Sequence, residues 1–500
     1  MYLFALLAAV SASAAEPTLR YAEDRAPAIV NPLFATSMAE ARLNELVFES
    51  LFSDDHDLRS APQLAERFEL SDDKTSMTLH LRHGVRWHDG KPFDADDVVF
   101  TINAMQDAGT ASTEAGRAAW IASATATDAH TLQLSFAAPE HAPQDKLHFK
   151  ILPEHRFEGL PIKRTDPFRN RPMGTGPWTV QAFNEDSSIS LARNADHWRE
   201  ASLPGLSMRE VSDKNYQSKL LIYKSLDLLV RVLPRDLAPL QNDREVRLYP
   251  YQTNSWWYVG FNHKDSRLSD KRLREALSLL VDVPELLRPI GTGQLVTGPF
   301  VVSSPYYDHD VPARANDPDR AGALLREAGY NFDGRHWVDS AGAPLKLRIA
   351  SQADLETSQD VVINLQSQLQ NQGIVVEPKF LRRAEWKQRV WRDRDFDLIL
   401  SQWSFDRNED VYEQLHSEGG RNFVGYSSAQ VDALLESARD SVDPQVKKQQ
   451  LRKVHALTAA DAPMVFLWTL DNYAAVSTKV EKVEIHPFYF FTWATDWTLR

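Results

Sequence analysis

Residues 81–100 read LRHGVRWHDGKPFDADDVVF and are the most informative stretch of this chain. Apolar and polar residues alternate up to Val85, which predicts a short strand. The run His88–Pro92 favours turns, because glycine tolerates a positive φ and proline fixes its own φ. Asp94 then offers an N-cap oxygen, and Asp97 places a second carboxylate at the positive end of a helix. We therefore expect a strand, two turns and an abrupt helix start.

The length and composition are those of a large globular protein. A chain of 500 residues suggests about three domains. Apolar residues make up 43% and charged residues 25%, which is ordinary for a soluble protein. The formal net charge of −13 argues against a nucleic-acid partner and against docking on anionic lipid, although it does not exclude a small patch of either sign.

Residues 1–15 have the pattern of a secretory signal peptide. An apolar core over residues 2–10 is followed by small residues suited to cleavage, and the apolar run is too short to span a bilayer. The chain has no cysteine, which excludes disulfides, thiolate metal sites, a cysteine nucleophile and a lipid-bearing cysteine. We therefore expect a periplasmic protein, exported through a Sec-type signal peptide, that is not a lipoprotein.

Hydrophobic periodicity predicts two kinds of region after the leader. Residues 61–157 are rich in predicted strands and carry one strong helix at 94–105. Gly174–Trp178 marks a tight turn that leads into a strand. The later alternation of strands and helices favours a parallel sheet with crossover helices, an α/β fold. The strands are expected at 254–262, 345–350, 374–377 and 396–403, and the helices at 269–281, 357–372, 384–392 and between Asp317 and Gly329.

Several of these motifs, in this order, resemble the extracytoplasmic solute-binding proteins for dipeptides, oligopeptides and nickel (family 5), which serve ABC importers. The resemblance spans nearly the whole mature chain. It implies the periplasmic binding protein-like fold of type II, with three domains and two lobes joined by a hinge, whose closure traps the ligand. The residues that carry it are 62–66, 81–100, 174–177, 193–194, 197–198, 261–262, 273–277, 282 and 317–330.

The same resemblance implies domain boundaries. Residues 1–15 are the signal peptide, and residues 57–171 form a domain inserted into the first lobe. The second lobe is continuous over residues 253–473. The first lobe is discontinuous and consists of residues 16–56, 172–252 and 474–500.

The best candidate for a ligand site follows the strand predicted at 396–403. Ligands of open α/β sheets gather beyond the carboxyl ends of strands. An ammonium held away from water needs a carboxylate partner, so Asp406 is the expected partner of a peptide's amino end and Trp403 an apolar wall. In the peptide-binding members that this segment resembles, an Asp three residues after a Trp holds that amino group. Spacing alone favours a solvated loop acid at Asp406. The candidate residues here are Trp403, Ser404, Phe405 and Asp406.

Other segments supply further candidates. Trp256 alternates with Trp257, so one face of their strand is expected in the core, whereas the other could line a cleft. Thr36 and Ser37 lie in a segment that resembles the one pairing with an extended peptide backbone, and an ordinary loop is about as good an interpretation. Some oligopeptide binders carry a basic residue where this chain has Leu400, which leaves the preferred peptide length open.

The main functional prediction is a binding protein that captures short peptides and delivers them to an ABC permease and ATPase complex in the inner membrane. We expect a monomer without cofactor, metal or nucleic-acid partner, since His88, His148 and His155 lack the spacing of metal ligands. One alternative keeps the fold but binds a nickel chelate, haem, an oligosaccharide or an opine-like compound. A distant alternative is a periplasmic hydrolase, although HExxH, GxSxG and a catalytic carboxylate pair are missing from the sequence.

Overall fold

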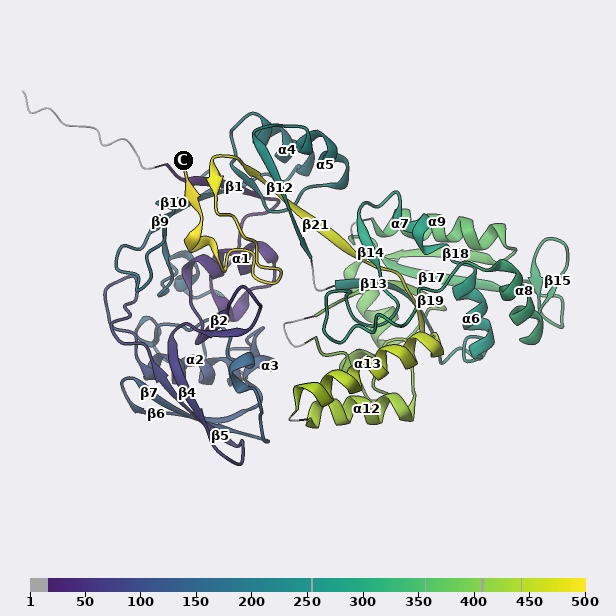
Figure 1. The fold of residues 1–500 in the computed structure, drawn as a ribbon, viewed down its shortest axis with the longest axis horizontal. Coiled ribbons are helices and arrows are strands. Elements are labelled where there is room, and N and C mark those ends of the chain that lie inside the picture. The colour runs from purple at the N-terminus through teal and green to yellow at the C-terminus, as the bar shows by residue number, and fades with distance from the viewer. Residues whose placement is uncertain (1–16, 253–254, 356, 406–408, 442) are drawn as a thin grey trace, which may run out of the picture. The chain divides into compact units, whose positions relative to one another are not determined.

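The chain divides into two compact units that are described separately. They comprise Met1–Tyr249 with Tyr473–Arg500, and Pro250–Asn472. The chain passes between them in β12 (Val246–Gln252) and β21 (Trp468–Ser477), which are neighbouring strands of one sheet. The expected leader lies outside the described residues. Figure 1 shows the computed structural model, which describes residues 17–252, 255–355, 357–405, 409–441 and 443–500.

The first unit is built on a mixed sheet in the order β12-β21-β11-β1-β10-β9-β8. Strand β1 runs parallel to β10 and β11, whereas β9 pairs antiparallel with β8 and β10. Two helices, α4 (Lys214–Ile222) and α5 (Pro234–Gln241), pack leucines against this sheet. The other strands are β1 (Leu19–Glu23), β8 (Trp178–Phe183), β9 (Ile189–Arg193), β10 (Gly205–Glu210) and β11 (Leu228–Leu229).

A second, antiparallel sheet in the same unit has the order β4-β5-β7-β6. It confirms the strand-rich region expected between residues 61 and 157. Helix α2 (Ala95–Gln106) packs on β6 and α3 (Ala115–Ala118) follows it. The strands of this part are the hairpin β2 (Phe52–Asp54) and β3 (Ser60–Pro62), with β4 (Ala65–Leu70), β5 (Ser76–Leu81), β6 (Ile121–Asp128) and β7 (Thr131–Phe136).

The start of α2 confirms the helix predicted from residues 81–100. The Asp94 side chain accepts a hydrogen bond from Asp96 N at 3.1 Å, and Asp97 Oδ2 accepts one from Asp94 N at 3.2 Å, which completes a capping box. Asp97 is also buried and accepts hydrogen bonds from Trp87 Nε1 at 2.9 Å and Glu154 N at 2.8 Å. Burial raises the pKa of Asp97 to about 6. Asp97 therefore not only caps α2 but also binds this helix to Trp87 and to the backbone at Glu154.

The turns of this stretch hold another segment in place. His88 Nε2 lies 2.9 Å from Gly176 O, and Gly174 N donates to His88 Nδ1 at 3.3 Å. Gly176 N in turn donates to Val47 O at 2.9 Å, at the end of α1 (Met38–Val47). A Cβ atom on Gly174 would lie 1.8 Å from Val47 O, so only glycine fits there. Residues 81–100 thus connect the β4-β5-β7-β6 sheet to α1 through the Gly174–Gly176 turn.

The second unit contains a mixed sheet in the order β18-β17-β19-β13-β20. Strand β17 runs parallel to β18 and β19, whereas β13 pairs antiparallel with β19 and β20. The parallel sheet expected from the sequence is therefore confirmed for β17, β18 and β19, whereas the strand expected at 254–262 runs antiparallel. Helical crossovers join β17 to β18 and β18 to β19, as parallel pairing requires, whereas β13 and β20 lie next to the points where the chain passes between the two units. The strands are β13 (Ser255–Phe261), β17 (Lys346–Gln352), β18 (Val375–Leu381), β19 (Leu398–Ser404) and β20 (Met464–Phe466).

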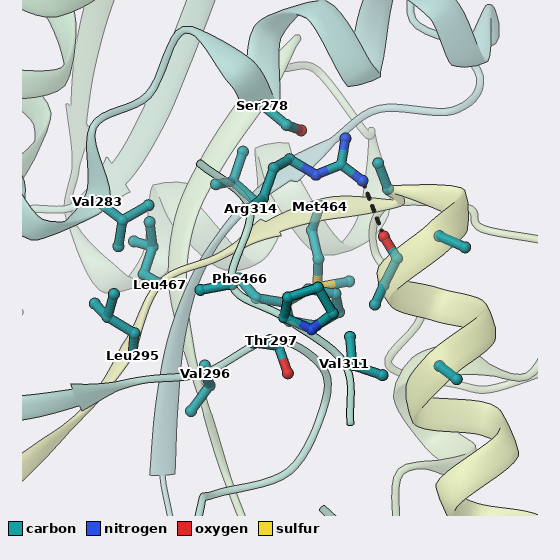
Figure 2. A pocket seen from close by; sticks show the side chains of 17 residues that line it. Ser278, Val283, Leu295, Val296, Thr297, Val311, Arg314, Met464, Phe466 and Leu467 are labelled. Atoms are coloured by element: carbon teal, nitrogen blue, oxygen red, sulfur yellow. Dashed lines mark hydrogen bonds between the residues drawn. The ribbon is translucent and has the colours of Figure 1, made fainter. Parts of the chain in front are cut away.

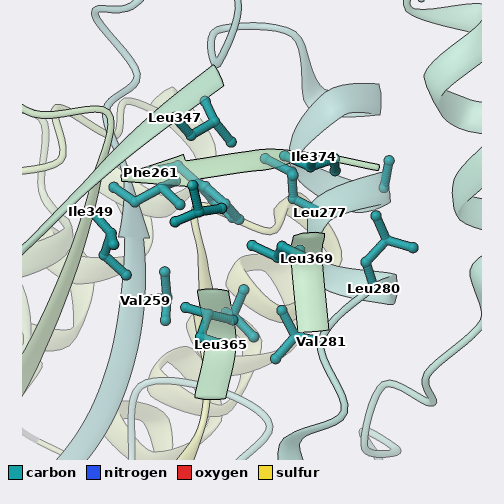
Figure 3. Packing of buried hydrophobic residues seen from close by; sticks show 14 of the residues in the cluster. Val259, Phe261, Leu277, Leu280, Val281, Leu347, Ile349, Leu365, Leu369 and Ile374 are labelled. Atoms are coloured by element: carbon teal, nitrogen blue, oxygen red, sulfur yellow. The ribbon is translucent and has the colours of Figure 1, made fainter. Parts of the chain in front are cut away.

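Both faces of this sheet are buried. Trp257 belongs to one apolar cluster together with Val259 and Phe261, which Figure 3 shows, whereas Trp256 and Tyr258 belong to the other. The alternation predicted for this strand is confirmed, and a strand covered on both faces reads as a continuous apolar run. The helices that supply these clusters are α6 (Lys271–Leu279), α7 (Val283–Leu287), α8 (Pro318–Glu327), α9 (Ser358–Asn371), α10 (Arg383–Trp386), α11 (Tyr412–Leu415), α12 (Ala429–Asp440) and α13 (Pro444–Asp461).

The helix predicted at 384–392 is only partly α-helical. After α10 the chain continues as a π-helix over Lys387–Arg392. Within the described residues, no helix is both long enough and apolar enough to cross a membrane.

Candidate functional site

The carboxyl end of β19 carries the residues predicted to contact a ligand. Trp403 is buried in the second cluster of the second unit, and Ser404 is exposed. Phe405 is half-buried and stacks on Phe300, with ring centroids 6.0 Å apart and an interplanar angle of 14°. Asp406 lies outside the described residues, so its role stays a prediction.

The described residues on both sides of 406–408 are anchored to the same loop. Phe405 rests on Phe300, and on the far side Glu409 accepts a hydrogen bond from Ser304 Oγ. Phe300 is itself fully buried and stacks on His455 of α13 at 6.2 Å. The end of β19 therefore packs against a buried aromatic cluster.

Trp256 and Trp403 stand directly opposite each other on β13 and β19. Trp256 is completely buried, whereas Trp403 is 8% exposed. Neither indole N–H has a hydrogen-bond partner among the described residues. A buried donor without an acceptor costs about 1–3 kcal/mol. The two indole N–H groups are therefore buried without an acceptor among the described residues, within an otherwise apolar cluster.

Thr36 and Ser37 belong to the first unit and are exposed at the start of α1. The Glu40 carboxylate accepts hydrogen bonds from Thr36 N at 2.7 Å and from Ser37 N at 3.1 Å. The Ser37 Oγ accepts one from Glu40 N at 3.2 Å. Thr36 Oγ1 also donates to Glu40 Oε2 at 3.3 Å, and Ser37 O accepts a hydrogen bond from Ala41 N at 3.0 Å. The polar groups of this segment therefore mainly form the start of α1.

The histidines singled out in the sequence have structural partners. His148 Nε2 lies 3.0 Å from Ser60 Oγ, and His155 Nε2 lies 2.9 Å from Asp89 Oδ2. Burial lowers the pKa of His88, which holds the Gly174–Gly176 turn. No cluster of potential metal ligands occurs in the part of the chain that the structure describes.

A cavity that the sequence did not predict lies within the second unit (Figure 2). Its volume is about 350 Å³, and it contains none of the predicted site residues. Its walls come from segments between residues 278 and 467, which are far apart in sequence. No local pattern could have revealed it, because its walls are brought together only by tertiary packing.

Comparisons with known proteins place this geometry in context. The model of the bacterial extracellular solute-binding proteins, family 5 middle, matches residues 60–422. The oligopeptide-binding protein AppA of Bacillus subtilis is 24% identical over 479 residues, covering 92% of this chain and 88% of that protein.

Two solved structures share the fold. The structure of AppA from Bacillus subtilis in complex with a nonapeptide has a TM-score of 0.79 and 22% identity, covering 97% of this chain and 99% of that chain. The structure of NikZ from Campylobacter jejuni in complex with Ni(L-His) has a TM-score of 0.80 and 22% identity, covering 96% and 99%. The same architecture therefore holds chemically different ligands.

Proposed function

The chain belongs to the bacterial extracellular solute-binding proteins, family 5, and on that basis we propose that it captures short peptides and delivers them to an ABC importer. It is a solute receptor and not an enzyme, so the hydrolase alternative is set aside. The relative AppA is named as an oligopeptide-binding protein, and another relative, from Escherichia coli, as a dipeptide-binding protein. These names support a peptide as the solute.

One observation carries the proposal. The aromatic pair Trp403 and Phe405 is held against buried neighbours immediately before Asp406, at the carboxyl end of β19. An apolar wall beside a carboxylate suits the amino end of a peptide, because the ammonium needs a counter-charge and the first side chain needs an apolar contact.

Each candidate residue has a proposed role. Asp406 pairs with the peptide ammonium, and Trp403 and Phe405 form the wall for the first side chain. Ser404 offers an exposed hydroxyl for the peptide backbone. Trp256 backs Trp403 from the neighbouring strand.

Thr36 and Ser37 would meet the peptide from the first unit. Their N–H groups are engaged by Glu40 and the Ser37 carbonyl by Ala41 N, so we assign to that contact the Thr36 carbonyl oxygen and the remaining hydrogen-bonding capacity of the two hydroxyl groups. Hydrogen bonds to a peptide backbone do not depend on the peptide's sequence, which suits a receptor that accepts many peptides.

The finer organisation is part of the proposal. We assign residues 57–171 to an inserted domain and residues 253–473 to a second lobe, with the remaining mature residues forming the first lobe. The protein would act in the periplasm as a monomer, after removal of residues 1–15, together with a permease and ATPase complex. Closure on the peptide would produce the form that the permease recognises, because binding shifts the population toward whichever state holds the ligand more tightly.

Titration calorimetry with dipeptides to pentapeptides tests the proposal. We expect binding, and we expect N-acetylation of the peptide to weaken it at least tenfold, because acetylation removes the ammonium. Asp406→Asn should cause a similar loss for the free peptide and no further loss for the acetylated one. Asp440→Asn, which changes an exposed acid on α12, is the matched control and should leave affinity unchanged.

Two results would contradict this assignment. Absence of heat with every peptide, together with binding of a nickel–histidine complex, would favour the non-peptide alternative. Unchanged affinity in Asp406→Asn would remove Asp406 from the site while leaving the peptide receptor intact. Mass spectrometry of ligand carried through a gentle purification identifies the natural solute directly.

A further inference from the structure

The cavity of the second unit is built as a ligand site separate from the end of β19. It is lined by α13, by the segments around residues 295–297 and 311–314, and by residues 464–467, which comprise β20 and the residue after it (Figure 2). Most of its lining residues are apolar. The apolar lining residues are Val283, Leu295, Val296, Val311, Pro312, Ala313, Ala456, Ala459, Ala460, Ala462, Met464, Val465, Phe466 and Leu467.

Arg314 is the only charged residue in this lining. Figure 2 shows its side chain reaching across the cavity, where Nη2 donates to Ala459 O at 3.0 Å. Arg314 forms no ion pair among the described residues, and it is an exposed residue, so its end of the cavity faces solvent. A guanidinium with most of its donors unused favours a carboxylate, which it can hold through two parallel hydrogen bonds.

The two lining hydroxyl groups are already engaged within the protein. Ser278 Oγ donates to Arg274 O at 2.8 Å. Thr297 Oγ1 lies 3.0 Å from Tyr307 Oη and 2.8 Å from His455 Nε2. The cavity therefore offers one cationic contact at its open end and an apolar interior, which suits a ligand with a single anionic head and an apolar body.

The volume limits the length of that body. A water molecule occupies about 30 Å³, so a cavity of about 350 Å³ has room for roughly ten groups of that size. A methylene group is of similar size. A fatty acid of membrane-lipid length would not fit, whereas a chain of about eight to ten carbons would fill the space.

We propose that this cavity binds a medium-chain aliphatic carboxylate, with the carboxylate on Arg314 and the chain between α13 and residues 464–467. The alanines of α13 make room for the chain, because Ala456, Ala459 and Ala460 present only methyl groups to it. This site is independent of the peptide assignment, so the receptor would carry a second, small amphipathic ligand.

Calorimetry on the full chain with sodium octanoate, below its micelle concentration, tests the proposal. We expect octanoate to bind with one site, and octylammonium and 1-octanol to bind at least tenfold more weakly. Arg314→Gln should weaken octanoate binding at least tenfold and leave 1-octanol unchanged. Arg320→Gln, an exposed arginine on α8, is the matched control and should change nothing.

A filled cavity gives a second test. Ala456→Phe should abolish binding of both octanoate and 1-octanol, while peptide binding stays as in the unaltered protein. If that variant does not fold, Arg314→Gln still tests the proposal, because a substitution of this exposed residue is expected to leave the fold intact. No octanoate binding, or equal binding of octanoate and octylammonium, would overturn the proposal. Loss of octanoate binding when the protein is saturated with peptide would also overturn it, since the ligand would then occupy the peptide site.

Discussion

At the residue scale, burial determines the protonation state of His455, which packs against Phe300 next to the candidate site. Its ring is completely buried between Phe300 and Tyr307, and Nε2 meets Thr297 Oγ1. Its Nδ1 is buried and has no partner among the described residues. Burial lowers the pKa of His455 to about 4, so the ring is neutral in the folded protein near pH 7.

Acid should therefore destabilise the protein through His455. The unfolded histidine has a pKa of about 6.5, so between pH 6.5 and about 4 the unfolded chain binds a proton that the folded chain does not. The contribution of His455 to the free energy of unfolding is therefore complete above pH 6.5. It decreases as the pH falls from 6.5 to about 4, by on the order of 3 kcal/mol in total. Urea unfolding at pH 7.5, 5.5 and 4.5 measures the effect.

The contribution of His455 can be separated from that of other groups. His455→Gln should reduce the change in the free energy of unfolding between pH 7.5 and 4.5. His83→Gln, which alters an exposed histidine, should leave that change as it is in the unaltered protein. His263, whose pKa burial and nearby Arg274 also lower to about 4, should sustain part of the slope in the His455 variant. An identical slope in His455→Gln and the unaltered protein would contradict this assignment.

At the element scale, the fold depends on a turn that touches a helix end. The Gly174–Gly176 turn lies against the last carbonyl groups of α1 and is held by His88 from the stretch 81–100. The sequence identified the glycines as turn residues. Only the structure shows that the missing side chains of these glycines also leave space for the carbonyl group of Val47, which is distant in sequence.

Gly174→Ala should destabilise the protein by about 3 kcal/mol, because its methyl group would overlap Val47 O and force the turn away from α1. Gly116→Ala is the matched control, since a Cβ there meets nothing within 4 Å and alanine favours the helix α3. The control should change stability by no more than about 1 kcal/mol. Thermal and urea unfolding measure both variants, and equal stabilities would show that the turn moves freely.

At the scale of the whole molecule, the two units differ in how the chain builds them. The second unit is continuous over Pro250–Asn472 and contains its own sheet with an apolar cluster on each face. The first unit needs residues from both ends of the chain. Its sheet includes β21, and Trp493 Nε1 donates to Asp54 O at 3.1 Å across 439 positions of sequence.

A fragment of residues 250–472 should therefore fold alone. We expect it to show the circular dichroism of a mixed α/β protein and to unfold in one cooperative urea transition. A fragment of residues 16–249 should not, because it lacks β21 and the buried Trp493 and Trp497. A cooperative transition in that fragment, or none in the first, would contradict the division.

The sequence by itself determined what depends on near neighbours. The cap at Asp94, the alternation of Trp256 and Trp257 and the strand predicted at 396–403, which the structure places at Leu398–Ser404, each follow from spacing within a few residues. The family also followed from ordered local motifs. The position of the candidate site at the end of a strand belongs to the same class of prediction.

The tertiary structure decided what depends on distant contacts. The antiparallel course of β13, the fit of Gly174 on Val47 and the cavity at Arg314 each join segments that share no local pattern. The physical reason is that strand direction, close backbone approach and enclosed volume are properties of packing. The hydrophobic periodicity of a segment determines which of its faces is buried. Which other segment covers that face is determined only by packing in the tertiary structure.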